Sequence, residues 1–180
     1  MKYIFRFFLL IAAIVAFFAF IGAMLPRGYD FAADIEIAAP ASEIFPKINS
    51  LPVWQDWSMQ WNPDVIEGLE IQYNQPTKGK GAAQTWTDSR GDGKLWITAS
   101  SLDQSIDYKM IFANFPEMES QFLLESSGED KTKVTWSSKG SLPSGPFYGY
   151  FGSFFSTHMK SEYDKSLGKL KEIVEAESDL

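Results

Sequence analysis

The sequence predicts an α+β domain in which an antiparallel sheet curves around one long C-terminal helix, preceded by a helix that spans a membrane. Three observations support this prediction. An uncharged apolar run occupies residues 7–25. Six segments of strand length follow one another between Val65 and Lys139. Apolar side chains then recur every three or four residues from about Phe147 to Glu175, the spacing of an amphipathic helix.

The apolar run is long enough to cross a bilayer. As a helix, residues 7–25 would extend roughly 28 Å, close to the ~30 Å hydrocarbon core of a membrane. A cleavable signal peptide is the alternative, and Ile21-Gly22-Ala23 resembles a cleavage site, but such apolar regions are normally only about 7–15 residues long. Length therefore favours an uncleaved, single-pass anchor. Lys2 and Arg6 precede it, so we expect residues 1–6 in the cytoplasm and the rest exported, to the periplasm if the source is bacterial.

Composition excludes several classes of function. The chain has no cysteine and one histidine, so neither a disulfide framework nor a thiolate metal site is possible. All 23 acidic residues but only 14 of the 16 basic residues follow the apolar run, so the predicted exported part has a formal charge of −9. An acidic surface without a basic cluster argues against nucleic acid as a partner. We predict no catalytic residue, metal ligand or cofactor.

The elements before the sheet are short. Residues 26–33 are predicted to be a tether, "ADIEIAAP" alternates as a short strand, and "PASEIFPKIN" begins as a helix with proline in its first turn. The stretch "LPVWQDWSMQW" follows, with Trp54, Trp57 and Trp61 at spacings of three and four.

The predicted strands have one apolar face. Ile106, Tyr108, Met110 and Phe112 alternate with polar residues, and later segments repeat this pattern; the six segments are 65–73, 82–89, 94–100, 105–113, 119–126 and 132–139. One buried and one wet face is typical of an antiparallel meander. The long helix supplies the cover that the buried face requires, and an acidic tail at 177–180 is expected to be solvated.

A family resemblance follows from this order of elements. With "APASEIF" after the first strand, "LPVWQDWS" after the first helix and "TKVTWSSKGSLP" at the last strand, the chain resembles the START-like superfamily. More narrowly, it is similar to the SRPBCC, or polyketide cyclase/dehydrase-like, proteins over about residues 33–176. The resemblance implies a helix-grip fold for a domain at 34–176: seven antiparallel strands around a long C-terminal helix, with a hydrophobic cavity between them. Members bind lipids and other apolar ligands, and only some are enzymes.

The residues expected to line this cavity are mostly aromatic. Trp54 is assigned to the core, while Trp57 and Trp61 are placed towards the cavity. The full set of predicted cavity residues is Trp57, Trp61, Trp86, Trp96, Tyr108, Phe112, Phe122, Trp136, Tyr148, Phe155 and Met159.

Polar candidates are few. Gln84 and Asp88 share a strand face with Trp86, so they are the possible polar patch inside the cavity, although an outward-facing strand end is the commoner place for such an aspartate. His158 falls off the apolar stripe of its helix and is expected at the surface. The stretch 145–159 holds more aromatics than one buried stripe requires, which leaves open a frayed helix start, a flap over the cavity or a contact with the membrane.

Three hypotheses about function remain. The first is a membrane-anchored carrier or sensor of a hydrophobic small molecule or lipid, which needs a cavity of a few hundred Å³. The second is a cyclase, dehydratase or isomerase, which needs buried ionisable groups with shifted pKa values, Asp88, Tyr108 or Tyr163 being the candidates. The third is an interaction module that binds an unknown protein partner through residues 147–155.

Overall fold

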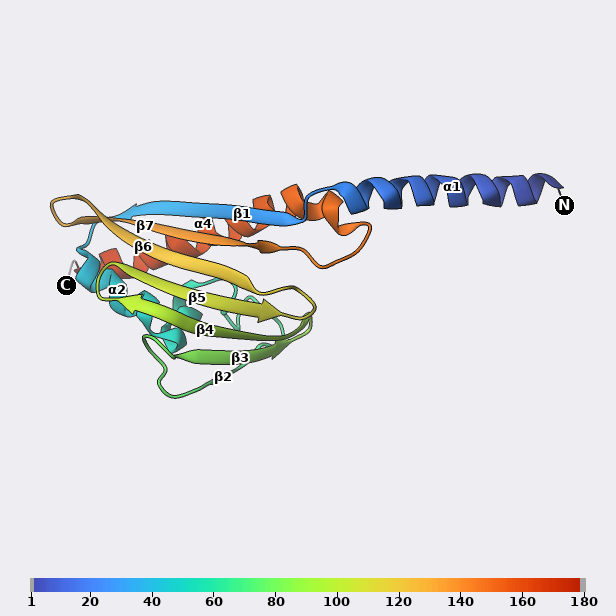
Figure 1. Ribbon diagram of the computed structural model, residues 1–180. Helices are drawn as coiled ribbons and strands as arrows, with labels where there is room; N and C mark the ends of the chain where they lie inside the picture. The colour runs from blue at the N-terminus through green and yellow to red at the C-terminus, as the bar shows by residue number, and fades with distance from the viewer. Residues whose placement is uncertain (1, 179–180) are drawn as a thin grey trace.

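The computed structural model describes residues 2–178 and shows a curved sheet packed on a long C-terminal helix, with an N-terminal helix that projects away from the domain (Figure 1). In chain order the elements are α1 (Lys2–Met24), β1 (Gly28–Ile37), α2 (Ala41–Asn49), η1 (Leu51–Val53), α3 (Trp54–Trp57), β2 (Glu70–Tyr73), β3 (Ala83–Asp88), β4 (Gly91–Ser101), β5 (Ser105–Phe112), β6 (Met118–Gly128), β7 (Lys131–Ser141), η2 (Tyr148–Phe151) and α4 (Gly152–Ser178).

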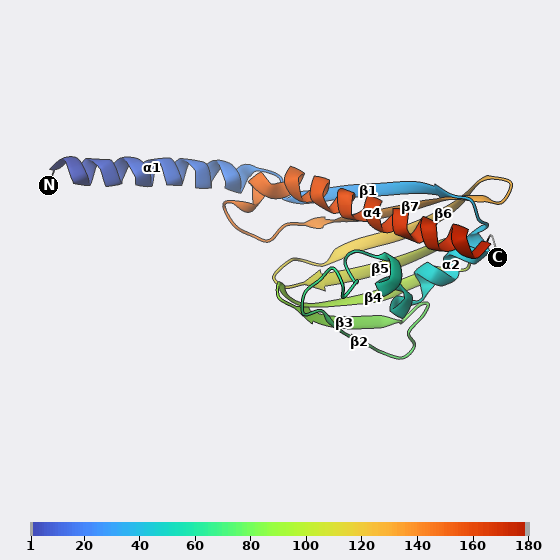
Figure 2. The same cartoon turned by 180° about the vertical axis from the view of Figure 1, so that it is seen from behind.

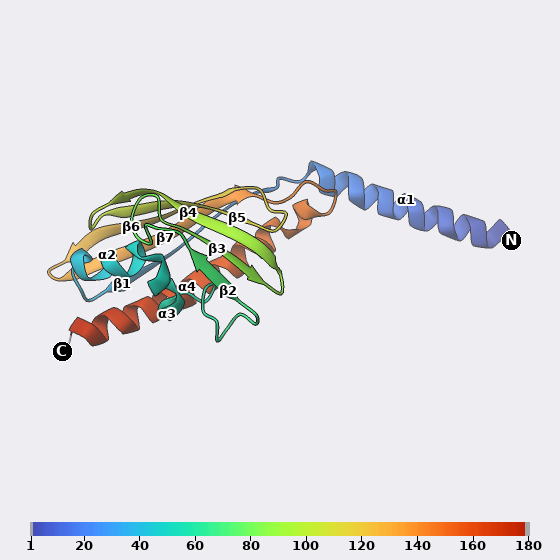
Figure 3. The same cartoon turned by 90° about the horizontal axis from the view of Figure 1, so that it is seen from below.

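The seven strands form one antiparallel sheet in the order β1-β7-β6-β5-β4-β3-β2. Strands β2 to β7 follow one another as the predicted meander, whereas β1 pairs with the last strand, with Gly28 opposite Ser141 and Ile37 opposite Thr132. Figures 2 and 3 show α4 running along β1 on the inner face of the sheet, with α2 and α3 on the same side. This arrangement confirms the predicted α+β helix-grip fold.

Aromatic side chains join the sheet to the helices in the centre of the core. Trp54 and Trp57 from the short α3 pack edge-on against Phe122 and Trp136, at centroid distances of 5.6 to 6.4 Å. The ring of Trp136 stacks on Tyr163 of α4 at 3.6 Å. The indole N–H of Trp54 donates to the Ile48 carbonyl at 2.9 Å, so the ring is buried without an unpaired donor. Trp54 is therefore a core residue, as predicted.

Three predicted boundaries differ from the structure. The predicted tether is wrong from residue 28 onward, because Tyr29, Phe31 and Ala33 already alternate inward and β7 is long enough to pair with them. The segment 65–73 forms a strand only from Glu70, since turns that begin at Asn62 and Ile66 occupy its first half. The C-terminal helix begins at Gly152 after a 3₁₀ turn, and it extends to Ser178, beyond the predicted start of the tail; residues 179–180 lie outside the described chain.

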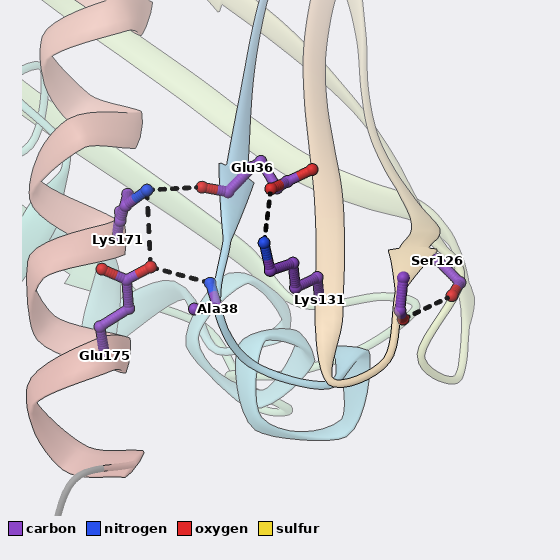
Figure 4. A network of polar contacts seen from close by, with 7 residues as sticks. Glu36, Ala38, Ser126, Lys131, Lys171 and Glu175 are labelled. Carbon is purple, nitrogen blue, oxygen red and sulfur yellow. Dashed lines mark hydrogen bonds and ion pairs between the residues drawn. The ribbon is translucent and has the colours of Figure 1, made fainter.

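Polar contacts fasten the C-terminal end of α4 to the end of β1 (Figure 4). The Lys171 ammonium donates to the Glu36 carbonyl at 2.8 Å, and the Ala38 N–H donates to the Glu175 carboxylate at 2.8 Å. Lys171 and Glu175 also pair at 3.5 Å, as does Lys131 with the Glu36 carboxylate. These exposed pairs are individually weak. Together with the stack on Tyr163 they hold α4 along the edge strand, so the helix is anchored at the end remote from α1.

The N-terminal helix α1 is long and apolar enough to cross a membrane, although a signal sequence near the N-terminus meets the same criteria of length and composition. Most of its side chains are exposed, but Gly22 is buried against the domain. A Cβ atom at Gly22 would lie 1.9 Å from the Pro146 carbonyl oxygen, and one at Gly149 would lie 2.6 Å from the Gly22 carbonyl oxygen. The two glycines thus permit direct backbone contact between α1 and the segment that precedes α4.

Candidate functional site: an aromatic cavity between sheet and helix

A cavity of about 280 Å³ lies between the sheet and the first half of α4, in the part of the domain nearest α1. It is bounded by β3, β5, the turn before β2 and the helix. Most of its walls are apolar or aromatic, with ionisable groups among the rest, and the lining consists of Tyr29, Met59, Gln60, Trp61, Ile66, Trp86, Arg90, Met110, Phe112, Phe115, Met118, Phe155, His158, Met159 and Glu162. Its volume is just below the usual range for ligand pockets, about 300–1,000 Å³.

The sheet side of the cavity is a stack of rings made possible by one glycine. Gly93 on β4 lies between two aromatic residues: it is opposite Trp86 on β3 and opposite Phe112 on β5. Without a side chain at Gly93, the Trp86 indole lies directly over β4 and stacks with Phe112 at 6.0 Å. Trp61 meets Trp86 edge-on at 4.5 Å and closes one side. The wall is therefore rigid, because each ring is held by another ring.

The helix side of the cavity follows from helical spacing on α4. Phe155, His158, Met159 and Glu162 lie three or four residues apart, so they share the face turned towards the cavity. Phe155 is held by ring contacts with Tyr29 at 4.8 Å and Phe115 at 5.7 Å. Burial raises the pKa of Tyr29 to about 12, so its phenol is protonated at neutral pH. The helix side of the cavity is therefore mainly aromatic, with a few polar groups between the rings.

An ion pair closes the β3–β4 turn beside the cavity. The Arg90 guanidinium donates to the Asp88 carboxylate at 2.7 Å, and the Arg90 backbone N–H donates to the same carboxylate at 2.7 Å. These hydrogen bonds hold the pKa of the Asp88 carboxyl below its ordinary value although the side chain is buried. The Arg90 guanidinium also lies over the Phe112 ring, at 5.7 Å from its centroid. Asp88 thus positions the one arginine of the cavity wall and stays ionised.

Several buried polar groups near the cavity have no hydrogen-bond partner among the described residues. They are the indole N–H of Trp61, the amide nitrogen of Gln60, the hydroxyl of Ser58 and both amide atoms of Gln84. Trp61 and Gln60 belong to the cavity lining, whereas Gln84 lies one position along the inner face of β3 from Trp86. The possible polar patch of Gln84 and Asp88 is therefore buried but does not line the cavity. Because buried polar groups are normally paired, these orphan groups are the unusual feature of the site.

A separate cluster of hydroxyl groups lies deeper in the core. The Ser138 hydroxyl bonds with those of Ser120 and Tyr163, and the Trp136 indole N–H donates to the Tyr108 hydroxyl at 2.8 Å. Burial raises the pKa of Tyr108 and of Tyr163, well above the ordinary value for Tyr163, so both phenols remain protonated. Neither tyrosine nor Asp88 lines the cavity. The three groups proposed for acid–base chemistry therefore do not meet there.

The structure separates the predicted cavity residues into three groups. Those that line the cavity are Trp61, Trp86, Phe112, Phe155 and Met159. Those packed in the core instead are Trp57, Tyr108, Phe122 and Trp136. Two lie elsewhere: Trp96 is on the outward face of β4, where the Lys94 ammonium sits 5.5 Å from its ring centroid, and Tyr148 is exposed on η2.

The lining residues outside the predicted set come from turns, from the flank of α4 and, for Tyr29, Met110 and Met118, from strands. Met59, Gln60 and Ile66 belong to irregular backbone, where no periodicity marks an inward face. His158 is exposed, as expected from its angular position, yet it also lines the cavity and stacks with Phe154 at 6.2 Å. The sequence signal for this position is its helical spacing, three residues from Phe155 and four from Glu162. Among residues 2–178, no group of histidine and acidic side chains could hold a metal ion.

Two larger hollows, of 410 and 550 Å³, lie on the outward face of the sheet. Charged and polar side chains line them, Glu119 and Lys139 in both. Glu119 pairs with Lys109 and with Lys139 across the strands, and Asp107 accepts a hydrogen bond from the Gln121 amide. Such hollows lack the apolar walls that bury a small ligand. The 280 Å³ cavity is therefore the candidate site.

A sheet curved around a C-terminal helix, with an apolar cavity between them, defines a helix-grip domain of the START-like class. The family model described as "Polyketide cyclase / dehydrase and lipid transport" matches residues 29–175. The chain belongs to this family, which confirms the resemblance in its sequence. No curated protein matches the chain.

Solved structures show the same fold at low identity. Norcoclaurine synthase from Thalictrum flavum, a point mutant with a transition-state analogue, has a TM-score of 0.62 at 14% identity, over 85% of this chain and 98% of that one. TTHA0849 from Thermus thermophilus has a TM-score of 0.62 at 17% identity, over 83% and 99%. CV1439 from Chromobacterium violaceum has a TM-score of 0.58 at 13% identity, over 81% and 96%. At these identities the likeness establishes the fold alone.

Proposed function

We propose that this protein is a membrane-anchored binding domain for a hydrophobic small molecule or lipid that has an oxygen acceptor, and that it acts as a carrier or sensor rather than as an enzyme. The observation that carries the proposal is the aromatic 280 Å³ cavity beside α4. Transfer of apolar ligand surface from water into such a cavity is favourable by about 25 cal/mol per Å². The lipid-transport description of the family supports the same class of ligand.

The unpaired N–H donors of Trp61 and Gln60 support the proposal that the ligand has an oxygen acceptor. Both side chains line the cavity, and each has a buried N–H group without a partner in the described chain. A carbonyl, ether or hydroxyl oxygen on the ligand would satisfy such a donor after a small movement of the side chain. Leaving a buried donor unpaired costs about 1–3 kcal/mol, so a ligand with this oxygen is favoured over a pure hydrocarbon.

The contacts of α1 support a retained anchor. The Tyr150 hydroxyl donates to the Phe18 carbonyl at 2.7 Å, and Gly22 packs against Pro146. The candidate cleavage site Ile21-Gly22-Ala23 falls inside this contact. With Lys2 and Arg6 in the cytoplasm, the domain would lie on the outer side of the membrane, where lipid-soluble ligands are within reach.

Filling the cavity is the direct test. We expect Met159→Trp to abolish co-purification of an apolar ligand with the full-length chain, because the larger side chain occupies space that the ligand needs. The measurement is native mass spectrometry of the detergent-solubilised protein, followed by organic extraction. Ser161→Trp places the same side chain at an exposed position of α4 and should retain the ligand. Equal ligand content in both variants and the native chain would contradict the proposed site.

Removing one donor tests the chemical class of the ligand. Trp61→Phe keeps an aromatic wall against Trp86 but deletes the indole N–H. We expect it to weaken binding of an apolar fluorescent probe with a carbonyl group about 5-fold, equivalent to roughly 1 kcal/mol for one hydrogen bond. Binding of a hydrocarbon probe of similar size should change by less than about 2-fold, because a hydrocarbon accepts no hydrogen bond from the indole. An equal loss of affinity for both probes would show that Trp61 contributes packing but no hydrogen bond to the ligand.

A further inference from the structure

Five exposed aromatic side chains surround the junction between α1 and the domain. Phe147, Tyr148, Tyr150 and Phe151 belong to η2 and the turn before it, and Phe154, whose side chain is 72% exposed, belongs to the first turn of α4. We call these five residues the aromatic collar. Soluble proteins rarely expose contiguous apolar patches of this kind without a partner. The core of the domain does not use them, since the buried stripe of α4 begins at Phe155 and continues through Tyr163.

The collar lies alongside the last two turns of α1. A Cβ atom at Gly149 would lie 2.6 Å from both the Gly22 carbonyl oxygen and the Leu25 Cβ atom, and the Tyr150 hydroxyl donates to the Phe18 carbonyl. Phe18 precedes Leu25 by seven positions, which corresponds to about 10 Å along a helix at roughly 1.5 Å per residue. If α1 crosses the bilayer, the collar is therefore level with the outermost ~10 Å of its apolar run.

We propose that the aromatic collar inserts into the boundary between lipid headgroups and acyl chains and fixes the domain on the bilayer. This inference rests on the membrane anchoring in the proposed function. Aromatic rings are enriched at this depth, where one end of a tyrosine is apolar and the other is hydrated. Interfacial segments bury their apolar face to about 5–10 Å, which agrees with the extent of the α1 contact. The occupant of this surface is thus the bilayer itself.

Insertion of the collar would place the cavity close to the bilayer surface. Phe155, His158 and Met159 lie on the turns of α4 directly after the collar, and Phe115 and Arg90 come from loops at the same end of the sheet. Figures 1 and 3 show these loops, β3–β4 and β5–β6, at the end of the domain from which α1 projects. The cavity consequently lies just above the lipid surface, so an apolar ligand passes between bilayer and cavity with little exposure to water.

The absence of cysteine makes the test direct, because one introduced cysteine takes a unique label. The full-length chain is placed in phosphatidylcholine nanodiscs with an environment-sensitive nitrobenzoxadiazole group at Phe154→Cys. The control is Leu102→Cys, which is 74% exposed in the β4–β5 turn. That turn is at the end of the sheet remote from α1 (Figure 1). Both positions start as exposed apolar side chains, so labelling perturbs the fold at neither.

We expect lipids brominated near the headgroup end of the acyl chain to quench the label at position 154 by roughly half, since it lies within the ~10 Å boundary layer. The label at position 102 should be unaffected. Equal fluorescence at both positions, with and without brominated lipid, would overturn the inference. Loss of α1 from the purified chain, detected as a lower mass, would also overturn it.

Ligand content measured on the same nanodiscs separates this inference from the proposed function. Quenching at position 154 without any bound ligand would support the collar and contradict the binding function. Bound ligand without quenching would support the binding function and contradict the collar. Replacing Phe147, Phe151 and Phe154 by serine gives a second readout. We expect the transfer of ligand from vesicles to slow at least about 10-fold while affinity in detergent is unchanged, because only the apolar contact with lipid is removed.

Discussion

Trp54→Ala is expected to destabilise the domain by about 3–5 kcal/mol, the usual cost of truncating a large buried aromatic side chain. The indole is fully buried and contacts Trp57, Tyr108, Phe122 and Trp136. The substitution also deletes its hydrogen bond to the Ile48 carbonyl. Since domains of this kind are stable by only about 5–15 kcal/mol, the loss is a large share of the total. Urea unfolding of the full-length chain in detergent, followed by far-ultraviolet circular dichroism, measures it.

Trp96→Ala is the matched control for this experiment. Trp96 lies on the outward face of β4, half-buried, and its described ring contact is with the Lys94 ammonium. Such a contact at an exposed site contributes roughly 0.5–1 kcal/mol, so the expected loss is several times smaller than for Trp54. Trp54→Phe should fall between the two, because it keeps most of the packing and loses the hydrogen bond. Equal destabilisation by the two alanine variants would contradict the assignment of Trp54 to the core.

Gly93→Val is expected to close the cavity by displacing Trp86. A Cβ atom at position 93 would lie 2.0 Å from the indole of Trp86, which no side chain can accommodate without moving the ring. The backbone of Gly93 does not require glycine, since its φ is outside the left-handed region, and valine is favourable in a strand. The obstacle is therefore the ring alone. We expect ligand affinity to fall at least about 10-fold, with an overpacking cost of roughly 1–3 kcal/mol in stability.

A second substitution and a control make this prediction specific. Adding Trp86→Leu to Gly93→Val should recover most of the lost stability, because the smaller side chain leaves room for the valine. Gly168→Ala on α4 is the control: its Cβ atom would meet nothing within 4 Å. It should stabilise the helix by up to about 1 kcal/mol and leave ligand affinity unchanged. Native affinity in Gly93→Val would show that Trp86 does not form part of the binding site.

Local patterns predicted the elements of the sheet well. Alternation in segments such as Ile106–Phe112 requires only that one face of a strand is buried, and pairing of β5 with its neighbours confirmed it. The same alternation is present at Tyr29 and Phe31, within the residues assigned to the predicted tether. The segment 65–69 shows the opposite error: its apolar residues resemble a strand, but the turns at Asn62 prevent pairing.

Periodicity did not distinguish the cavity from the core. Trp86 on β3 and Trp136 on β7 both face inward, yet Trp86 lines the cavity while Trp136 is covered by Tyr163. The difference depends on what lies opposite each ring across the interior. Opposite Trp136 is the middle of α4, packed against the sheet, whereas the space beside Trp86 is bounded by Trp61 and Met159 and remains partly open.

By itself, the sequence determined the α+β class, the apolar N-terminal helix and the aromatic character of the interior, because these depend on short-range spacing and composition. The helix-grip fold was implied by the family resemblance. Only the tertiary structure decided the position of the cavity and the contact between Gly22 of α1 and Gly149 before α4. Both features arise from residues far apart in the chain, and each depends on an absent side chain: glycine under Trp86, and glycine at the α1 junction. A missing Cβ atom leaves no periodic signal, and its effect appears only when two distant segments are brought together.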